Sequence, residues 1–124
     1  MATASGTTRS HGSAREGAST WMVQRLTAIA LVPLGLWFVA SAVSLSGADH
    51  AAVAAWLARP LNTTGMLLLI VTVFWHAQLG VQVIIEDYVH HDGTKLGGLM
   101  AANFALIAVG LACVVAVLKV SLGS

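Results

Sequence analysis

The chain has 124 residues, of which 57% are hydrophobic and 9% are charged, whereas about 25% of the residues of an ordinary soluble domain are charged. Its mean hydropathy of +0.83 excludes an ordinary water-soluble domain. Its formal net charge of +1 argues against a nucleic-acid partner and against a polybasic lipid anchor. We therefore expect an integral membrane protein in contact with membrane lipid.

Residues 1–20 are rich in Ser, Thr, Gly and Ala and contain almost no large apolar side chain. Such a segment buries too little surface to offset its loss of chain entropy. We expect a disordered tail, or one that lies on a partner. A cleaved signal peptide is disfavoured, because the apolar run that follows is longer than the usual apolar region of about 7–15 residues.

Three apolar stretches follow, at residues 26–45, 61–85 and 96–118, and none contains a charged residue. Because a spanning helix needs about 20 mostly apolar residues, each stretch is long enough to cross a membrane. We therefore predict an all-α membrane protein. Its residues 21–124 are expected to form three transmembrane helices, at about residues 22–45, 61–86 and 97–119.

The ends of these helices carry local signals. Trp21 suits interface depth at the start of the first helix, and Pro33 is expected to bend that helix. Trp56 lies among alanines, which indicates a short interfacial segment. Pro60 suits the first turn of the second helix, with an Asn or Thr nearby as cap, and the third helix is expected to begin after Gly98.

The Lys and Arg residues are distributed unequally between the two sides of the membrane. Four lie on the side of the N-terminal tail and of the loop after the second helix, and two lie on the other side. The side with the excess is normally cytoplasmic. We therefore expect the N-terminus in the cytoplasm.

The second helix carries a stripe of small and polar residues at spacings of three and four, which places them on one face. Small residues allow another helix to approach closely, and polar atoms facing lipid would be costly. This face is therefore expected to meet protein or a cofactor. Its members are Gly65, Leu69, Thr72, His76, Gly80, Val83 and Asp87.

His76 lies near the middle of the second span, and an ionisable residue at that depth is a functional candidate. One interpretation is a neutral histidine that is hydrogen-bonded to a neighbouring helix. The other is an axial ligand of a b-type haem, for which Gly80, one turn away, would leave room. This chain has no second histidine within a span, so the other ligand would come from another subunit.

Asp87 and Tyr88 end the second span at the membrane boundary, about 16 Å from His76 along the helix axis. A phenol and a carboxylate there could bind and protonate a quinone; alternatively, Tyr88 belongs to the aromatic belt and precedes a solvated loop. Arg25 enters the membrane on the same side and could pair with a haem propionate or a quinone oxygen, or could be a snorkelling anchor.

The remaining reactive side chains are expected to be inert. His90 and His91 are adjacent in a loop, which is a poor geometry for binding one metal ion, and we expect them to be solvated. Cys113 is the only cysteine and lies within the third span, so no intramolecular disulfide can form.

Three segments resemble the hydrophobic membrane anchor of succinate dehydrogenase, respiratory complex II. The resemblance covers the three-span layout, and its most specific part is the His-x3-Gly-x6-Asp-Tyr pattern of the second helix. The segments are Gln24-Arg25-Leu26-Thr27-Ala28, His76-Ala-Gln-Leu-Gly80 and Asp87-Tyr88-Val-His.

The resemblance implies a bacterial inner-membrane anchor that packs with a second, different three-helix membrane anchor around haem b. It also implies binding to the iron–sulfur subunit and, through it, to the flavoprotein subunit. His76 would be an axial ligand of the haem iron and Gly80 would pack on the haem. Arg25 would lie near the propionates, and Tyr88 and Asp87 would form part of the ubiquinone site.

The chain is not expected to oxidise succinate by itself, because it has no flavin-binding Gly-rich motif and no cysteine cluster for iron–sulfur ligation. Three alternatives stay open. The chain could be an anchor of a quinol:fumarate reductase, a small transporter or channel subunit in which His76 relays protons, or a structural anchor without haem.

Overall fold

The computed structural model describes the backbone of residues 2–123 and the side chains of residues 18–123. This part of the chain forms four helices: α1 (Ala2–Ser44), α2 (His50–Ala58), α3 (Pro60–Tyr88) and α4 (Asp92–Ser121). Three segments are long and apolar enough to cross a membrane, namely Ala18–Ser44 of α1 and the whole of α3 and α4. The predicted all-α fold with three spanning helices is confirmed.

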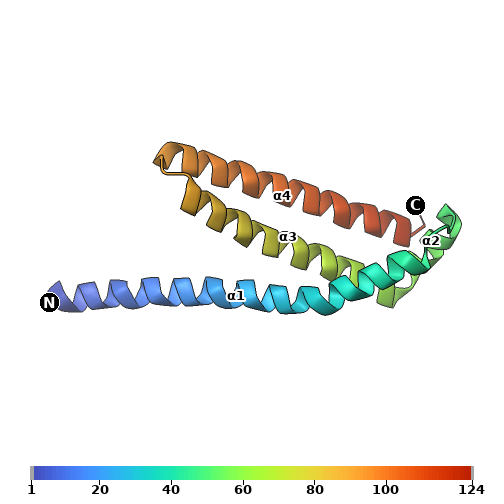
Figure 1. Cartoon of the computed structure of the whole chain (residues 1–124), viewed down its shortest axis with the longest axis horizontal. Coiled ribbons are helices and arrows are strands. Elements are labelled where there is room, and N and C mark those ends of the chain that lie inside the picture. Colours follow the sequence, from blue (N-terminus) through green and yellow to red (C-terminus); the bar gives the residue numbers. More distant parts are fainter. Residues whose placement is uncertain (1, 124) are drawn as a thin grey trace.

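Helix α1 begins before the expected start near Trp21, because its backbone is helical from Ala2. No proline precedes Pro33 in the sequence. Once the helix has formed in the span, each residue added at its N-terminal end forms one more backbone hydrogen bond, so the helix can extend. The N-terminal part of α1 projects beyond the ends of α3 and α4 (Figure 1). Contact of this segment with a partner remains a prediction.

The short helix α2 forms where the sequence indicated an interfacial segment. Asp49 is its N-cap residue, and its Oδ1 atom accepts a hydrogen bond of 2.9 Å from the Ala52 amide. This bond satisfies one of the amide groups that lack a partner at a helix start. The Trp56 ring of α2 stacks on Trp37 of α1, with ring centroids 5.7 Å apart.

Helix α3 starts with Pro60 in its first turn, as predicted, but no side chain caps it. The expected Asn or Thr cap is therefore wrong. The Asn62 amide instead donates to the Trp56 carbonyl of α2 (2.9 Å), and the Thr63 hydroxyl is hydrogen-bonded to the Ser121 hydroxyl of α4 (2.8 Å). These side chains join three helix ends instead of capping one.

Helix α4 begins at Asp92, earlier than the expected start near residue 97. A carboxylate in the first turn favours a helix start, because it interacts with the positive end of the helix dipole. Gly97 and Gly98 lie inside the helix. Each costs about 1 kcal/mol relative to alanine, which so long a helix tolerates.

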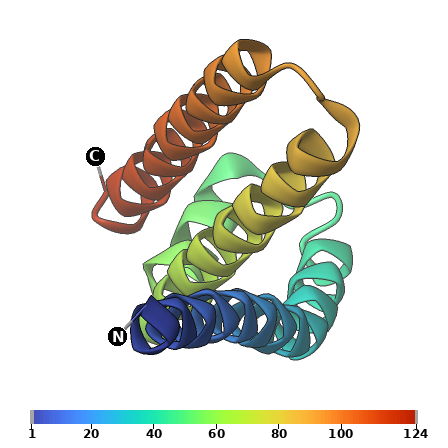
Figure 2. The same ribbon diagram turned by 90° about the vertical axis from the view of Figure 1, so that its left-hand side faces the viewer.

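Helix α3 lies between α1 and α4 and packs on both, whereas the backbones of α1 and α4 do not come close to each other in the described part of the chain. Figure 2 shows this order end-on. A small core lies where α2, α3 and α4 meet and contains Leu57, Ile70 and Val117. Few other residues are buried, so the spanning helices form an open layer and not a closed bundle.

Large apolar side chains remain exposed along the helices. Leu61 is 82% exposed, Phe104 is 75% exposed and Leu36 is 68% exposed. Apolar surface of this extent on long helices is covered by lipid or by another protein chain. The layer therefore has the surface of a membrane protein.

Candidate functional site

His76 lies near the middle of α3 and is hydrogen-bonded to α1. Its Nδ1 atom is 3.0 Å from the Thr27 hydroxyl oxygen, in a partly buried contact. The Thr27 hydroxyl also donates to the Gln24 carbonyl oxygen, at 2.9 Å. The face of α3 that carries the stripe therefore meets protein at this point, as the sequence predicted.

This pair of hydrogen bonds favours one tautomer of the His76 ring. A threonine hydroxyl has one hydrogen and can accept through its lone pairs. With the hydrogen of Thr27 on the Gln24 carbonyl, Oγ1 is left to accept from the ring, which favours the tautomer with a proton on Nδ1. In the neutral ring Nε2 then keeps a free lone pair, which is the form that binds a metal ion.

The Nε2 atom of His76 is accessible from outside the chain. No buried side-chain nitrogen or oxygen atom lacks a hydrogen-bond partner among the described residues, and no described residue bonds to Nε2. The ring lines a cavity of about 450 Å³ whose other walls come from one side of α1. These walls are Trp21, Gln24, Arg25, Ala28 and Ile29.

Arg25 supplies the positive charge of this cavity. Its guanidinium carbon lies 4.6 Å from the centre of the Trp21 ring, which is a cation–π arrangement. No carboxylate pairs with Arg25 among the side chains that the structure describes. Its charge is thus available to an anionic group in the cavity.

The two glycines of the stripe on α3 differ in the space around them. A Cβ atom built on Gly65 would lie 2.7 Å from the Trp37 ring of α1, whereas one built on Gly80 would meet nothing within 4 Å. Gly65 therefore allows the close approach of α1 that the sequence indicated. Open space lies beside Gly80, one turn from His76.

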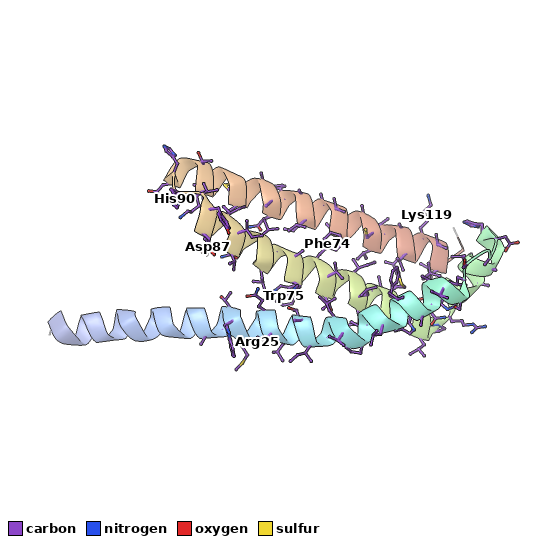
Figure 3. All side chains as sticks on the ribbon, viewed as in Figure 1. Arg25, Phe74, Trp75, Asp87, His90 and Lys119 are labelled. Carbon is purple, nitrogen blue, oxygen red and sulfur yellow. The ribbon has the colours of Figure 1, made fainter. Side chains whose placement is uncertain are left out.

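Asp87 and Tyr88 are exposed at the end of α3, and Tyr88 is 78% exposed. They do not line the cavity that holds His76 and Arg25. Asp87 and Arg25 lie toward the same end of the molecule, and Lys119 lies toward the other end (Figure 3). The structure thus brings His76 and Arg25 to one cavity and leaves Asp87 and Tyr88 exposed at the end of α3.

The other candidate ligands do not gather. Among the described residues no group of three or more His, Cys, Asp or Glu side chains is close enough to hold a metal ion. His90 and His91 are exposed, and Cys113 is a free thiol that packs beside the small core. His76 is the only His, Cys, Asp or Glu side chain among the described residues that line its cavity.

Sequence reasoning missed the roles of Thr27 and Trp21. In the sequence, Thr27 stands out only as part of the segment Gln24-Arg25-Leu26-Thr27-Ala28, and Trp21 only as an aromatic residue at the start of the first span. No sequence signal distinguishes Thr27, because any Thr in a helix can donate to the carbonyl three or four residues before it.

Comparisons with known proteins give consistent matches. A family model described as "Succinate dehydrogenase/Fumarate reductase transmembrane subunit" matches residues 1–117. The succinate dehydrogenase hydrophobic membrane anchor subunit of Rickettsia bellii (strain RML369-C) is 35% identical over 106 residues, which cover 86% of this chain and 85% of that protein.

Two further relatives have similar names. The succinate dehydrogenase hydrophobic membrane anchor subunit of Rickettsia conorii (strain ATCC VR-613 / Malish 7) is 30% identical over 110 residues, or 88% of this chain and 82% of that protein. The succinate dehydrogenase membrane anchor subunit of Reclinomonas americana is 33% identical over 85 residues, or 66% of this chain and 71% of that protein. No solved structure matches the chain.

Proposed function

Because the chain belongs to the family of succinate dehydrogenase and fumarate reductase transmembrane subunits, we propose that it contributes one axial ligand of a b-type haem and part of a quinone site. The matches confirm the resemblance to the hydrophobic membrane anchor of succinate dehydrogenase. The matches favour this family over a small transporter or channel subunit.

The proposed haem ligand is Nε2 of His76. The observation that carries the proposal is that His76 lines a cavity that also contains Arg25, while its Nδ1 atom is engaged by the Thr27 hydroxyl. Arg25 would neutralise propionate carboxylates, and the open space beside Gly80 would accept a flat group. A bound b-type haem supplies one-electron redox chemistry.

The second axial ligand would come from the second membrane anchor of the complex. The described spanning segments of α1, α3 and α4 contain no histidine besides His76. The exposed apolar surface of the open layer fits a second group of spanning helices. Haem binding between two chains would also explain why the cavity beside His76 is open on one side.

The proposed quinone site includes Tyr88 and Asp87. Reduction of a quinone to a quinol takes two electrons and two protons. The Tyr88 phenol would donate a hydrogen bond to a carbonyl oxygen of ubiquinone, and the Asp87 carboxylate would orient that phenol or pass protons to the ring. Both residues are exposed in this chain, so partner subunits would complete the site.

The electrons would come from succinate, which the flavoprotein subunit oxidises, by way of the iron–sulfur subunit. We place both on the cytoplasmic side of a bacterial inner membrane, together with the N-terminus, because more Lys and Arg lie on that side. An anchor of a quinol:fumarate reductase would use the same site in the opposite direction. By itself the chain would anchor the complex and would catalyse no reaction.

The test of the haem assignment is a reduced-minus-oxidised absorption spectrum of the purified complex. We expect His76→Ala to abolish the b-type haem signal and His90→Ala, in the exposed loop, to retain it. An assembled His76→Ala complex with the full signal would exclude His76 as the ligand.

A further inference from the structure

A chain of two hydrogen bonds connects the His76 ring to the backbone of α1. The Nδ1 atom lies 3.0 Å from the Thr27 hydroxyl oxygen, and this hydroxyl lies 2.9 Å from the Gln24 carbonyl oxygen. We propose that Thr27 is a positioning residue for the haem ligand: it holds the proton of His76 on Nδ1 and turns Nε2 toward the cavity. This inference rests on the haem function proposed above.

The direction of the two bonds follows from the atoms available. A backbone carbonyl can only accept, so the hydroxyl hydrogen points to Gln24, and the oxygen is left as an acceptor for the ring. A hydroxyl three residues after the carbonyl is well placed for this bond in a helix. Thr27 therefore presents an acceptor, in a fixed place, to a ring on another helix.

The surroundings of Thr27 offer few competing polar groups. A cavity of about 330 Å³ beside it is lined almost entirely by apolar residues of α1 and α3, with Thr72 as the other hydroxyl. No hydrogen bond joins Thr72 to His76 among the described residues. In such surroundings a polar atom without a hydrogen bond is costly. The Nδ1 atom of His76 is therefore held beside the Thr27 hydroxyl.

The consequence concerns the strength and character of the ligand. A ligating histidine usually donates its other ring N–H to a neighbouring acceptor, which fixes the ring and raises its basicity, and loss of that acceptor typically lowers metal affinity by about 10- to 100-fold. A more basic imidazole favours ferric iron. Without the acceptor we expect weaker haem binding and a higher midpoint potential.

The experiment compares four purified complexes: the wild type, Thr27→Val, Thr27→Ser and Thr72→Val. Valine has nearly the shape of threonine without its hydroxyl, and serine keeps the hydroxyl. Thr72→Val makes the same change one turn from His76, where no bond to the ring is lost. Haem release to an excess of an apo-globin scavenger and the midpoint potential from a redox titration are measured for each.

We expect Thr27→Val to bind haem about 10- to 100-fold more weakly and to raise the midpoint potential, whereas Thr27→Ser and Thr72→Val stay close to the wild type. If the valine variant does not assemble, Thr27→Ala, which removes the same acceptor without added bulk, is measured in its place with the same expected result.

Two outcomes overturn the positioning role and leave the haem function intact. One is a Thr27→Val complex with wild-type haem release and potential. The other is an equal effect of Thr72→Val, which would assign the change to packing. A wild-type complex without haem, or His76→Ala with its full haem signal, would overturn the haem function and the positioning role together.

Discussion

Thr27 of α1 and His76 of α3 are 49 positions apart in the chain, and their side chains meet with 3.0 Å between Oγ1 and Nδ1. The contact lies beside an otherwise largely apolar space between two spanning helices. It shows that a hydrogen-bonded histidine and a metal-binding histidine are compatible here. One ring nitrogen satisfies the helix contact, and the other remains available to a ligand.

Replacement of Tyr88 by phenylalanine tests the proposed quinone site. One hydrogen bond contributes about 0.5–1.5 kcal/mol, so we expect Tyr88→Phe to lower succinate-dependent ubiquinone reduction by roughly two- to thirteenfold. Reduction of an artificial acceptor at the soluble subunits should continue at the wild-type rate. Equal losses in both assays would indicate defective assembly and would contradict the assignment.

Asp87 should act through its charge. Asp87→Asn keeps the size and one acceptor oxygen of the side chain but removes the negative charge, so we expect slower ubiquinone reduction with unchanged artificial-acceptor activity. Asp92→Asn, at the start of α4, is the matched control and should retain both rates. If the two variants have the same effect on ubiquinone reduction, the charge of Asp87 has no specific role in the quinone site.

The space beside Gly80 can be filled. Nothing in the described chain lies within 4 Å of a Cβ atom built there, so Gly80→Leu should not disturb this subunit but should exclude a flat group bound next to His76. We expect a lower ratio of haem to protein in an assembled complex. Gly97→Leu, also in open space on α4, should keep the wild-type ratio, and a full haem content in Gly80→Leu would rule out packing at that glycine.

A side chain added at Gly65 should instead destabilise this subunit, because Gly65 packs against another residue of the same chain. A Cβ atom at Gly65 would lie 2.7 Å from the Trp37 ring, and overpacking of this kind costs about 1–3 kcal/mol. Gly65→Ala should lower the thermal unfolding midpoint of the complex, and Trp37→Leu added to it should restore part of the loss. Gly97→Ala, which meets no neighbour, should not lower the midpoint, and a Gly65→Ala complex of equal stability would contradict the close contact.

The proposed orientation can be read from the accessibility of single cysteines. In a Cys113→Ser background, His90→Cys marks the loop between α3 and α4, and Ala51→Cys marks α2 at the other end of the layer. A membrane-impermeant maleimide should label Ala51→Cys in spheroplasts and His90→Cys in inverted vesicles. The reverse pattern would place the N-terminus outside the cytoplasm.

The boundaries of the helices were less predictable than their existence. Long uncharged stretches predict spans because a charged group is costly in hydrocarbon. Asp92 and the residues before Trp21 fall outside the uncharged stretches, where hydropathy does not mark the end of a helix, and there α4 and α1 extend beyond the expected ends. The predicted Asn or Thr cap failed because those side chains found partners on other helices.

The amino-acid sequence by itself determined the three spans, the polar stripe on the middle one and the depth of His76, since each depends on spacing along a single helix. Tertiary structure alone decided that Thr27 faces His76, that Arg25 shares its cavity and that Gly80 is open while Gly65 is filled. These relations depend on how α1 and α3 are rotated about their axes. That rotation is set by packing contacts such as Trp37 on Gly65, between residues far apart in the chain.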